Sequence, residues 1–356
     1  MTFIHVSDVH IGNIPDSDKP WGKDREFDIS DTFSCVIKKC KELNCDLLLI
    51  SGDLFHRQPL TSDLNTINDL FKTIPNTTVV ATAGNKDYIR PNSAILSYNF
   101  ASNVHYFLND YPEVYEIPDL NCVIHGFSYR TQEINRPIID TIEVKEDDKT
   151  HILIAHGGDQ NHVPIDFDRL KQKNFSYVAL GHIHKHEEID DHIVYAGSLE
   201  PQSQQEIKEH GIYIGEINTM TRRLENLHFE PMAKVSYIPL TIKISETTTR
   251  EALINSIEQE MNTRGINNIY KLRLEGDRNP DVEFNLHILE SKYRILDVID
   301  ETEPKYDFAE LSREHPNDMI GAFIRSFQEK DIDDMSYVQK KALFYGINAL
   351  LKTRDH

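Results

Sequence analysis

Short apolar runs that end in polar, glycine-rich turns alternate with helical stretches from residue 1 to about residue 235. Residues 3–6 predict a strand, Ser30 or Asp31 is expected to cap a helix with apolar residues three to four positions apart, and the apolar residues 47–50 predict a strand buried on both faces. Further strands are expected at residues 78–81, 122–124, 152–155, 177–180 and 192–195. So many short buried strands indicate an α/β fold with two packed sheets flanked by helices.

The pattern changes between residues 230 and 238. Strands are expected at 237–244, 268–274 and 294–299, and helices at 249–261 and 284–293, which predicts a small α+β domain. From Tyr306 onward the chain is expected to be helical, with segments near 317–330 and 335–352. Apolar residues cover more of the last helix than one buried stripe needs, so that helix either packs on its own domain or docks on another protein.

The length of 356 residues accommodates two or three domains, and we expect boundaries at 1–236, 237–300 and 301–356. No run of residues approaches the apolar length of a membrane span, and the chain enters its first strand directly, without the pattern of a secretory signal. The sequence therefore predicts a cytoplasmic protein. Its cysteines show neither paired spacing nor disulfide-scaffold density, so Cys35, Cys40, Cys45 and Cys122 are interpreted as buried thiols.

The formal net charge of -20 argues against a protein that coats nucleic acid with a broad basic face. It does not exclude a phosphodiester substrate, because divalent metal ions in a cleft reverse the sign of the charge locally. A basic partner could supply further contacts to a phosphate backbone.

Five short segments place metal-type ligands just past the ends of predicted strands, where open α/β folds bind their ligands. They are Asp8-Val9-His10, Gly52-Asp53-Leu54-Phe55-His56, Gly84-Asn85-Lys86-Asp87, His156-Gly157 and Gly181-His182-Ile183-His184. Each motif alone is weak, but the set is specific. Two neighbouring divalent ions need a bridging carboxylate, imidazoles, a carbonyl oxygen and open positions, and the residues that supply these are Asp8, His10, Asp53, Asn85, His156, His182 and His184. The indicated reaction is phosphoester hydrolysis.

These segments, in this order and spacing, resemble the calcineurin-like metallophosphoesterases, and the Gly52–His56 segment is similar to SbcD-type DNA repair exonucleases and the related YhaO group. The resemblance extends through residues 124–129 and 195–200 and is looser beyond residue 235. It implies a two-sheet metallophosphoesterase domain at 1–236, a cap domain at 237–300 and a helical segment at 301–356 that docks on an SMC-like coiled-coil ATPase.

The resemblance also implies exonuclease and endonuclease activity on DNA in double-strand-break repair and recombination, a homodimer, and two manganese ions, with magnesium, iron(II) or zinc as alternatives. The first ion would be held by Asp8, His10, Asp53 and His184, and the second by Asp53, Asn85, His156 and His182.

Lys86 departs from the family pattern, which has histidine at this position beside the phosphate. An imidazole exchanges a proton near pH 7, whereas a lysine ammonium mostly stays charged, so activity should fall by roughly 10²- to 10⁴-fold. His56 is then the main remaining group that donates to the phosphate. A non-catalytic scaffold that binds DNA ends or metal for an ATPase is one alternative, and a cyclic-nucleotide or other small-substrate phosphodiesterase is another. A protein serine/threonine phosphatase would carry Asp-Arg-Gly where this chain has Phe55-His56-Arg57-Gln58.

Other residues near these segments are interpreted more plainly. Trp21, Arg25 and Phe27 either pack in a loop or contact a nucleic-acid strand, and loop packing is the favoured interpretation. Asp87 is expected to orient its loop, while Asp159 and His186 are left unassigned. Ordinary polar or core roles are expected for His5, His105, His125, His151, His162, His186, His192 and His210.

Overall fold

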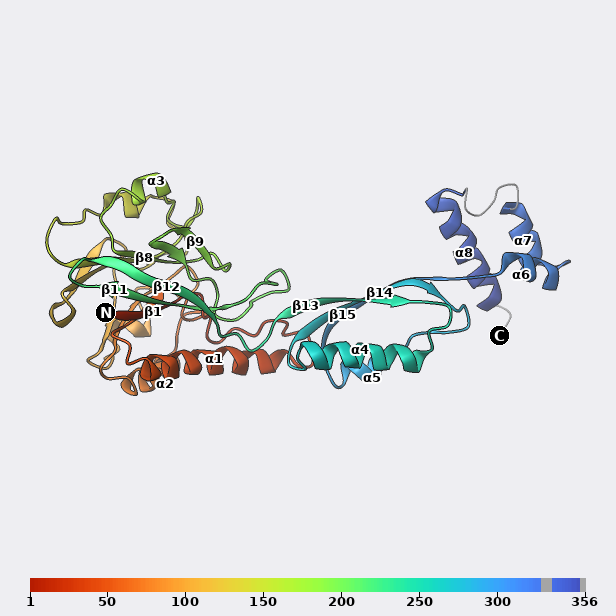
Figure 1. The fold of residues 1–356 in the computed structure, drawn as a ribbon, viewed down its shortest axis with the longest axis horizontal. Coiled ribbons are helices and arrows are strands. Elements are labelled where there is room, and N and C mark those ends of the chain that lie inside the picture. Colours follow the sequence, from red (N-terminus) through yellow and green to blue (C-terminus); the bar gives the residue numbers. More distant parts are fainter. Residues whose placement is uncertain (328–334, 353–356) are drawn as a thin grey trace. The chain divides into compact units, whose positions relative to one another are not determined.

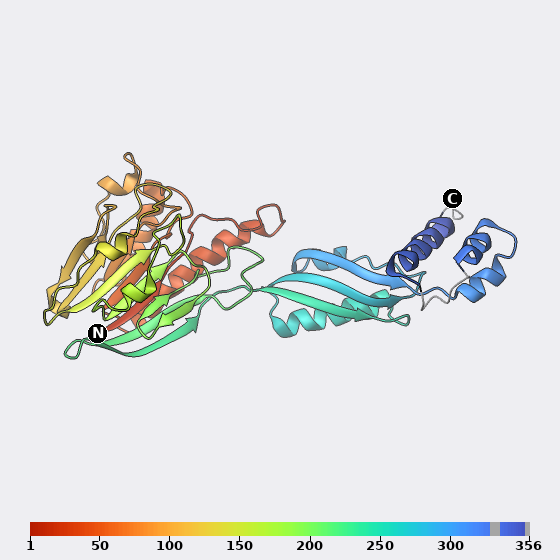
Figure 2. The same cartoon turned by 90° about the horizontal axis from the view of Figure 1, so that it is seen from above.

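The computed structural model describes residues 1–327 and 335–352, and it divides the chain into two compact units, Met1–Tyr237 and Ile238–His356. The first unit contains two six-stranded mixed sheets, and the second contains a three-stranded sheet followed by helices (Figures 1 and 2). The predicted α/β class, with two packed sheets, a smaller α+β part and C-terminal helices, is confirmed. Whether residues 237–300 and 301–356 serve as a cap and a docking segment stays a prediction.

The first sheet has the strand order β12-β11-β1-β2-β3-β4, in which β1 to β4 are parallel neighbours. Its strands are β1 (Thr2–Val6), β2 (Leu47–Ser51), β3 (Thr78–Thr82), β4 (Val104–Tyr106), β11 (Gly211–Asn218) and β12 (Arg223–Pro231). The second sheet has the order β5-β6-β7-β8-β10-β9, with β6, β7, β8 and β10 parallel. Its strands are β5 (Glu113–Ile117), β6 (Cys122–Gly126), β7 (Thr150–His156), β8 (Tyr177–Gly181), β9 (Glu187–Asp190) and β10 (Ile193–Tyr195).

The two sheets pack face to face because their central strands are apolar on both sides. Phe3 and Leu49 of the first sheet share a buried cluster with Ile152 and Tyr177 of the second. Residues one position away along the same strands, such as Ile4, point to the opposite face and pack on the helices. The helices are α1 (Gly22–Glu42), α2 (Thr61–Lys72) and the short α3 (Phe167–Leu170), with 3₁₀ turns at Ala94–Ser97, Pro118–Leu120 and Ile138–Thr141.

Several predicted boundaries were wrong. Helix α1 begins at Gly22, with Trp21 as its N-cap residue, and neither Ser30 nor Asp31 caps it. The buried stripe of the helix extends back through Ile29 and Arg25, and a buried arginine does not look like a core position in the sequence. The strands β4, β5, β9, β11 and β12 were not predicted.

In the second unit, β13 (Tyr237–Ile244), β14 (Ile269–Arg278) and β15 (Arg294–Pro304) form a sheet in that order. Helix α4 (Arg250–Arg264) begins after Thr249, whose hydroxyl accepts a hydrogen bond from the Ala252 N–H at 3.2 Å, and it buries Leu253, Ile257 and Met261. The helix predicted at 284–293 is reduced to α5 (His287–Glu290).

The C-terminal helices of the second unit are α6 (Phe308–Glu314), α7 (Met319–Phe327) and α8 (Tyr337–Lys352). They enclose a small cluster of their own that includes Phe308, Ile324 and Ile347. The helix predicted at 317–330 begins at Met319, and its residues 328–330 lie outside the described residues. Residues 335–336 of the next predicted helix precede α8.

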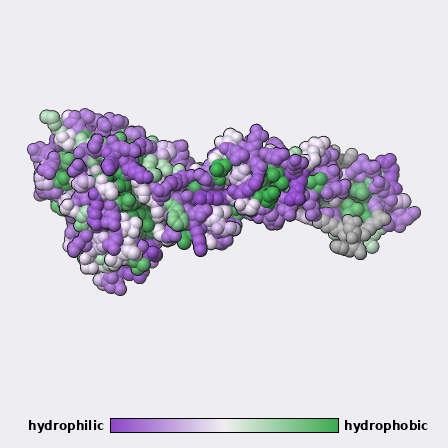
Figure 3. Space-filling model, turned by 90° about the horizontal axis from the view of Figure 1, so that it is seen from below, coloured by the Kyte–Doolittle hydropathy of each residue, from purple (hydrophilic) through white to green (hydrophobic). Residues whose placement is uncertain are grey.

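The surface drawn in Figure 3 is mostly hydrophilic, with scattered hydrophobic residues. Of the helices that the structure describes, none has the length and apolar character needed to cross a bilayer. Cys40, Cys45 and Cys122 are buried, as predicted, while Cys35 is half-buried.

Candidate metal centre

All the candidate ligands lie at the carboxyl ends of strands. Asp8 and His10 follow β1, Asp53 follows β2 and Asn85 follows β3, whereas His156 ends β7, and His182 and His184 follow β8. Because β1–β3 are parallel to one another and β7 is parallel to β8, each group of loops emerges at one edge of its sheet. An isolated bridge between Ser7 and Ser198 joins the two edges. The structure therefore brings all the predicted ligands together.

The first group consists of Asp8, His10 and His184. The Nε2 atoms of His10 and His184 face each other at 3.2 Å, and Asp8 Oδ1 lies 3.9 Å from the former and 3.7 Å from the latter. These ligand atoms all lie within 4.8 Å of one another. Such a convergence of two ring nitrogens and a carboxylate oxygen is typical of a transition-metal site.

The second group consists of Asn85, His156 and His182. Asn85 Oδ1 lies 2.9 Å from His156 Nε2 and 3.3 Å from His182 Nδ1. Asp53 Oδ2 connects the two groups, because it lies 3.5 Å from His156 Nε2 and 4.0 Å from His10 Nε2. The other oxygen, Oδ1, accepts a hydrogen bond from the backbone N–H of Lys86 at 2.8 Å. Asp53 thus presents one oxygen between the two groups, as a bridging carboxylate must.

The donor set fits divalent cations on the chemistry of its own atoms. Among the described residues none donates a hydrogen bond to Asp8 Oδ1, although that atom is buried. Its partner Oδ2 accepts from the Ser7 hydroxyl at 2.6 Å and the His182 N–H at 2.9 Å. A buried carboxylate oxygen without a donor is unfavourable unless a cation faces it.

Burial and like charge govern the protonation of the cluster. Burial, followed by the charges of Asp87 and Asp8, raises the pKa of Asp53 well above its usual value. Burial lowers the pKa of His156 to about 4, and burial followed by the neighbouring imidazoles lowers the pKa of His10. Neutral imidazoles are the form that binds metal, and cations would supply the positive charge that an ionised Asp53 needs.

The ligand loops require unusual backbone conformations. Asp8, His10, Asp53 and His182 have positive φ angles of 49°, 56°, 50° and 95°. Gly84 permits the close approach of two loops, because a Cβ atom there would lie 2.2 Å from Asp53 Oδ1. Asp87 holds the same loop by accepting hydrogen bonds from the Gly84 N–H at 2.7 Å and the Phe55 N–H at 3.2 Å, which agrees with its expected orienting role.

Carboxylates that were not predicted as site residues lie behind two of the histidines. Glu206 accepts from His184 Nδ1 at 2.9 Å, and Asp159 accepts from His182 Nε2 at 2.7 Å. His156 Nδ1 lies 3.0 Å from the Ser51 carbonyl oxygen. Asp159 also pairs with His162, so His162 lies at the edge of the cluster although it was expected to be an ordinary polar residue.

His56 and Lys86 lie on the accessible side of this cluster. His56 is half-buried, and its Nδ1 is 3.4 Å from His10 Nδ1. Burial, followed by the positive charge of Lys86, lowers the pKa of His56. The Lys86 side chain is exposed, while its backbone N–H is fixed on Asp53.

Trp21 precedes helix α1, and Arg25 and Phe27 lie within it. Arg25 is fully buried and pairs with Glu200, and Trp21 is 9% exposed. Both side chains therefore pack in the interior, as favoured, but Arg25 does so from helix α1 and not from a loop, whereas Phe27 is 73% exposed. His186 stacks on Phe229, with ring centroids 3.9 Å apart.

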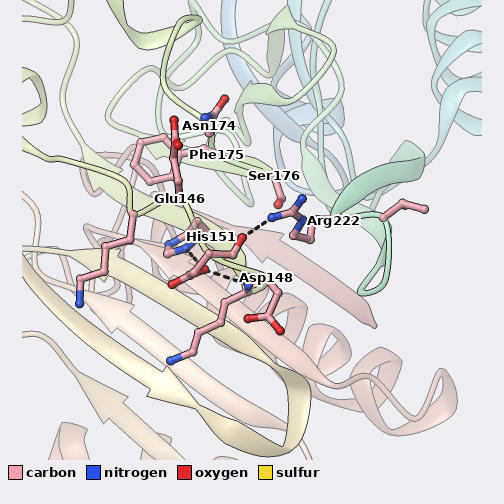
Figure 4. Close-up of a pocket in the computed structure, with 11 residues that line it drawn as sticks. Glu146, Asp148, His151, Asn174, Phe175, Ser176 and Arg222 are labelled. Carbon is pink, nitrogen blue, oxygen red and sulfur yellow. Dashed lines mark hydrogen bonds and ion pairs between the residues drawn. The ribbon is translucent and has the colours of Figure 1, made fainter.

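A separate cavity of about 680 Å³ lies near the amino-terminal ends of β7 and β8, opposite to the ends that carry the ligands (Figure 4). Several of its charged groups already have partners: His151 contacts Asp147 at 3.0 Å, Arg222 donates to the Asp147 carbonyl oxygen, and Lys149 pairs with Glu116 outside the cavity. We assign no ligand to this cavity.

Comparison with known proteins identifies the family of the segment that carries the candidate ligands. Residues 1–186 match the family described as calcineurin-like phosphoesterase. The DNA double-strand break repair protein Mre11 of Methanocaldococcus jannaschii is 31% identical over 224 residues, covering 56% of this chain and 57% of that protein. Mre11 of Archaeoglobus fulgidus is 28% identical over 233 residues, covering 56% of this chain and 50% of that protein.

YhaO of Bacillus subtilis, described as an uncharacterized metallophosphoesterase, is 22% identical over 364 residues, covering 95% of this chain and 80% of that protein. The chain spans about half the length of the two Mre11 proteins. Since residues 1–186 make up more than half of the chain and include every predicted ligand, this protein belongs to the calcineurin-like phosphoesterase family.

Proposed function

We propose that this protein is a two-metal phosphodiesterase that acts on DNA. One ion would be held by Asp8, His10, Asp53 and His184, and the other by Asp53, Asn85, His156 and His182. The observation that supports this most directly is the single oxygen of Asp53 between His10 and His156, beside a buried Asp8 oxygen that no described residue hydrogen-bonds. Manganese is the proposed metal, with magnesium, iron(II) or zinc as alternatives.

When bound, the two ions supply a hydroxide near neutral pH and neutralise charge on the phosphate. The chain itself contributes fixed ligand orientation, because the loops are tied to one another by the Asp8 N–H to Gly52 carbonyl bond of 3.1 Å and the His10 N–H to Asp53 carbonyl bond of 3.0 Å. His56 stands beside His10 on the accessible side and would donate a proton or hydrogen bond to the phosphate. Lys86 would balance phosphate charge but release a proton reluctantly.

A DNA substrate is proposed because proteins similar to this chain include DNA double-strand break repair proteins. A role in recombination and repair as the nuclease subunit of a complex, as a homodimer with an SMC-like coiled-coil ATPase, extends this proposal. The C-terminal helices offer exposed apolar side chains for such a partner, namely Met319, Val338 and Tyr345, which are 72%, 74% and 69% exposed. Residues 237–300 would form the cap.

Lys86 favours a second candidate function, a scaffold subunit that binds metal or DNA ends with little turnover. Burial is the main cause that lowers the pKa of His56, and the charge of Lys86 lowers it further. The same charge lies close to ligands that would have to bind two metal cations. Lysine thus weakens the site twice: it is a poor proton donor, and it opposes metal binding electrostatically.

A comparison of three substrates with manganese tests the proposed activity: linear duplex DNA, a p-nitrophenyl phosphodiester and a cyclic nucleotide. Cleavage of linear DNA that disappears in Asn85→Ala supports a nuclease. Hydrolysis of the cyclic nucleotide alone would reassign the substrate. Bound manganese without cleavage of any substrate would favour the scaffold.

Lys86→His and Lys86→Gln separate the two effects of the lysine. If proton transfer is limiting, the histidine variant gains up to roughly 10²- to 10⁴-fold while the glutamine variant gains little. If repulsion of the metals is limiting, both variants gain and both bind manganese more tightly than the native chain. No gain in either variant would refute the idea that Lys86 restrains activity.

A further inference from the structure

Asp159 lies outside the ligand set but contacts it through one short hydrogen bond. Its Oδ2 accepts from His182 Nε2 at 2.7 Å, while His182 Nδ1 faces Asn85 Oδ1 at 3.3 Å. A neutral imidazole carries one N–H and one lone pair. A carboxylate at Nε2 therefore keeps the proton there and leaves the lone pair of Nδ1 pointing into the cluster.

His184 has the opposite arrangement, because Glu206 accepts from its Nδ1 and its Nε2 faces Asp8 and His10. Two histidines separated by a single residue thus present different ring nitrogens to the centre. The histidine-rich motif in the sequence does not determine this choice of nitrogen. The carboxylate behind each ring determines it.

The Asp159 carboxylate is held by its own loop as well as by His182, and both of its oxygens lie 2.9 Å from His162 Nδ1. Its Oδ1 accepts from the Asn161 N–H at 2.8 Å and the His162 N–H at 3.0 Å. Two buried tyrosines brace the loop further upstream: the Tyr129 hydroxyl donates to the His156 carbonyl oxygen and the Tyr195 hydroxyl to the Gly157 carbonyl oxygen, both at 3.0 Å. Asp159 can therefore orient the imidazole of His182, because the backbone N–H groups of Asn161 and His162 hold its carboxylate in place.

We propose that Asp159 is a positioning residue, which fixes the tautomer and ring orientation of His182 so that its Nδ1 binds the second metal. This rests on the proposed two-metal centre. Carboxylates that hold a metal-binding histidine typically contribute roughly 10- to 100-fold to metal affinity. The competing interpretation is a separate cation held by Asp159, His162 and His182, whose ligand atoms lie within 4.8 Å of one another. It would require His182 to lose both ring protons, because Nδ1 already faces the centre.

The test uses the full chain, stripped with chelator, and follows manganese binding by isothermal titration and by electron paramagnetic resonance. We expect the native chain to bind two ions with the exchange-coupled signal of a manganese pair. Asp159→Ala should weaken one site by roughly 10- to 100-fold and leave the spectrum of an isolated ion at intermediate manganese. Asp159→Asn keeps an acceptor for His182 without the charge, so it should lose less. Asp168→Asn, an exposed carboxylate on α3, is the control and should leave both sites unchanged.

The other possible results contradict either the positioning role of Asp159 or the proposed two-metal function. If the native chain binds a third manganese ion, and Asp159→Ala removes that ion without affecting the other two, Asp159 is a ligand of a separate site. An intact pair with equal affinities in the native chain and both Asp159 variants would refute the positioning role while leaving the proposed function standing. A native chain that binds no manganese pair would refute the proposed function itself. Circular dichroism of the metal-free variants confirms that they fold.

Discussion

The buried ion pair between Arg25 and Glu200 offers a direct test of how helix α1 is held. Both side chains are fully buried, and Arg25 Nη1 lies 3.4 Å from Glu200 Oε2. Arg25 Nη2 also donates to the Pro201 carbonyl oxygen at 2.8 Å, and Glu200 Oε1 accepts from the Lys234 N–H at 2.6 Å. The pair connects helix α1 to the segment after β10, which carries Glu206 and thereby supports His184.

The substitution Glu200→Gln keeps the shape of the side chain but leaves the arginine charge in a dry environment. Breaking a buried pair from one side destabilises a protein by roughly 3–5 kcal/mol. We expect about 3 kcal/mol, the lower end of that range, because Asp28 remains 3.0 Å from Arg25 Nη1. The double variant Arg25→Met with Glu200→Gln should lose less than the sum of the single variants, with a coupling energy of about 1–3 kcal/mol.

Urea unfolding, followed by tryptophan fluorescence, measures the free energy of unfolding of each variant. Trp21 is a suitable probe because it is the single tryptophan of the chain and lies at the start of α1. The exposed pair Arg57–Asp63, with an N–O distance of 2.9 Å, is the matched control, and breaking it should change the free energy of unfolding by less than about 1 kcal/mol. A coupling energy for the buried pair no larger than that of the control pair would refute the reasoning.

Three further predictions follow from the site and the core. Removal of manganese with EDTA should lower the free energy of unfolding by roughly 2.7 kcal/mol for each ion present at 100 times its dissociation constant, and an unchanged melting temperature would contradict this. Burial lowers the pKa of His5 to about 3, from an unfolded value near 6.5. The free energy of unfolding of the metal-free protein should therefore fall as the pH decreases from 6.5 towards 3, by up to about 1.4 kcal/mol per pH unit. Urea unfolding of His5→Gln at several pH values should show a weaker dependence of this free energy on pH. Gly84→Ala places a Cβ atom 2.2 Å from Asp53 Oδ1, so calorimetric titration should show weakened manganese binding in a chain whose circular dichroism is retained.

The central buried strands and the ligand motifs at their ends could be predicted because both are local signals. An apolar run of four or five residues followed by Asp, Asn or His needs no distant information, and parallel strands bring such ends to one edge. The start of α1 could not be predicted in this way. Arg25 looks like a solvent-facing residue until Glu200, 175 positions later, accounts for its burial.

The supporting carboxylates were missed for a related reason. Asp159 and Glu206 lie 23 and 22 positions from the histidines they hold, in loops without a recognisable motif. Asp159 lies close to the His156-Gly157 motif in the sequence, but the sequence alone does not show that its side chain points towards His182. The role of Lys86 was visible in the sequence only as a departure from a pattern, and its electrostatic effect on His56 required coordinates.

The positive φ angles of Asp8, His10, Asp53 and His182 have a consequence for how this protein can evolve. Such conformations are unfavourable for residues with a side chain, on the order of 1–3 kcal/mol each, and they persist because the surrounding sheets enforce them. Glycine at these positions would relax the backbone while removing a ligand. If these residues bind metal as proposed, selection for thermal stability and selection for turnover act in opposite directions on the same positions, and a lineage without hydrolytic activity would be free to become more stable.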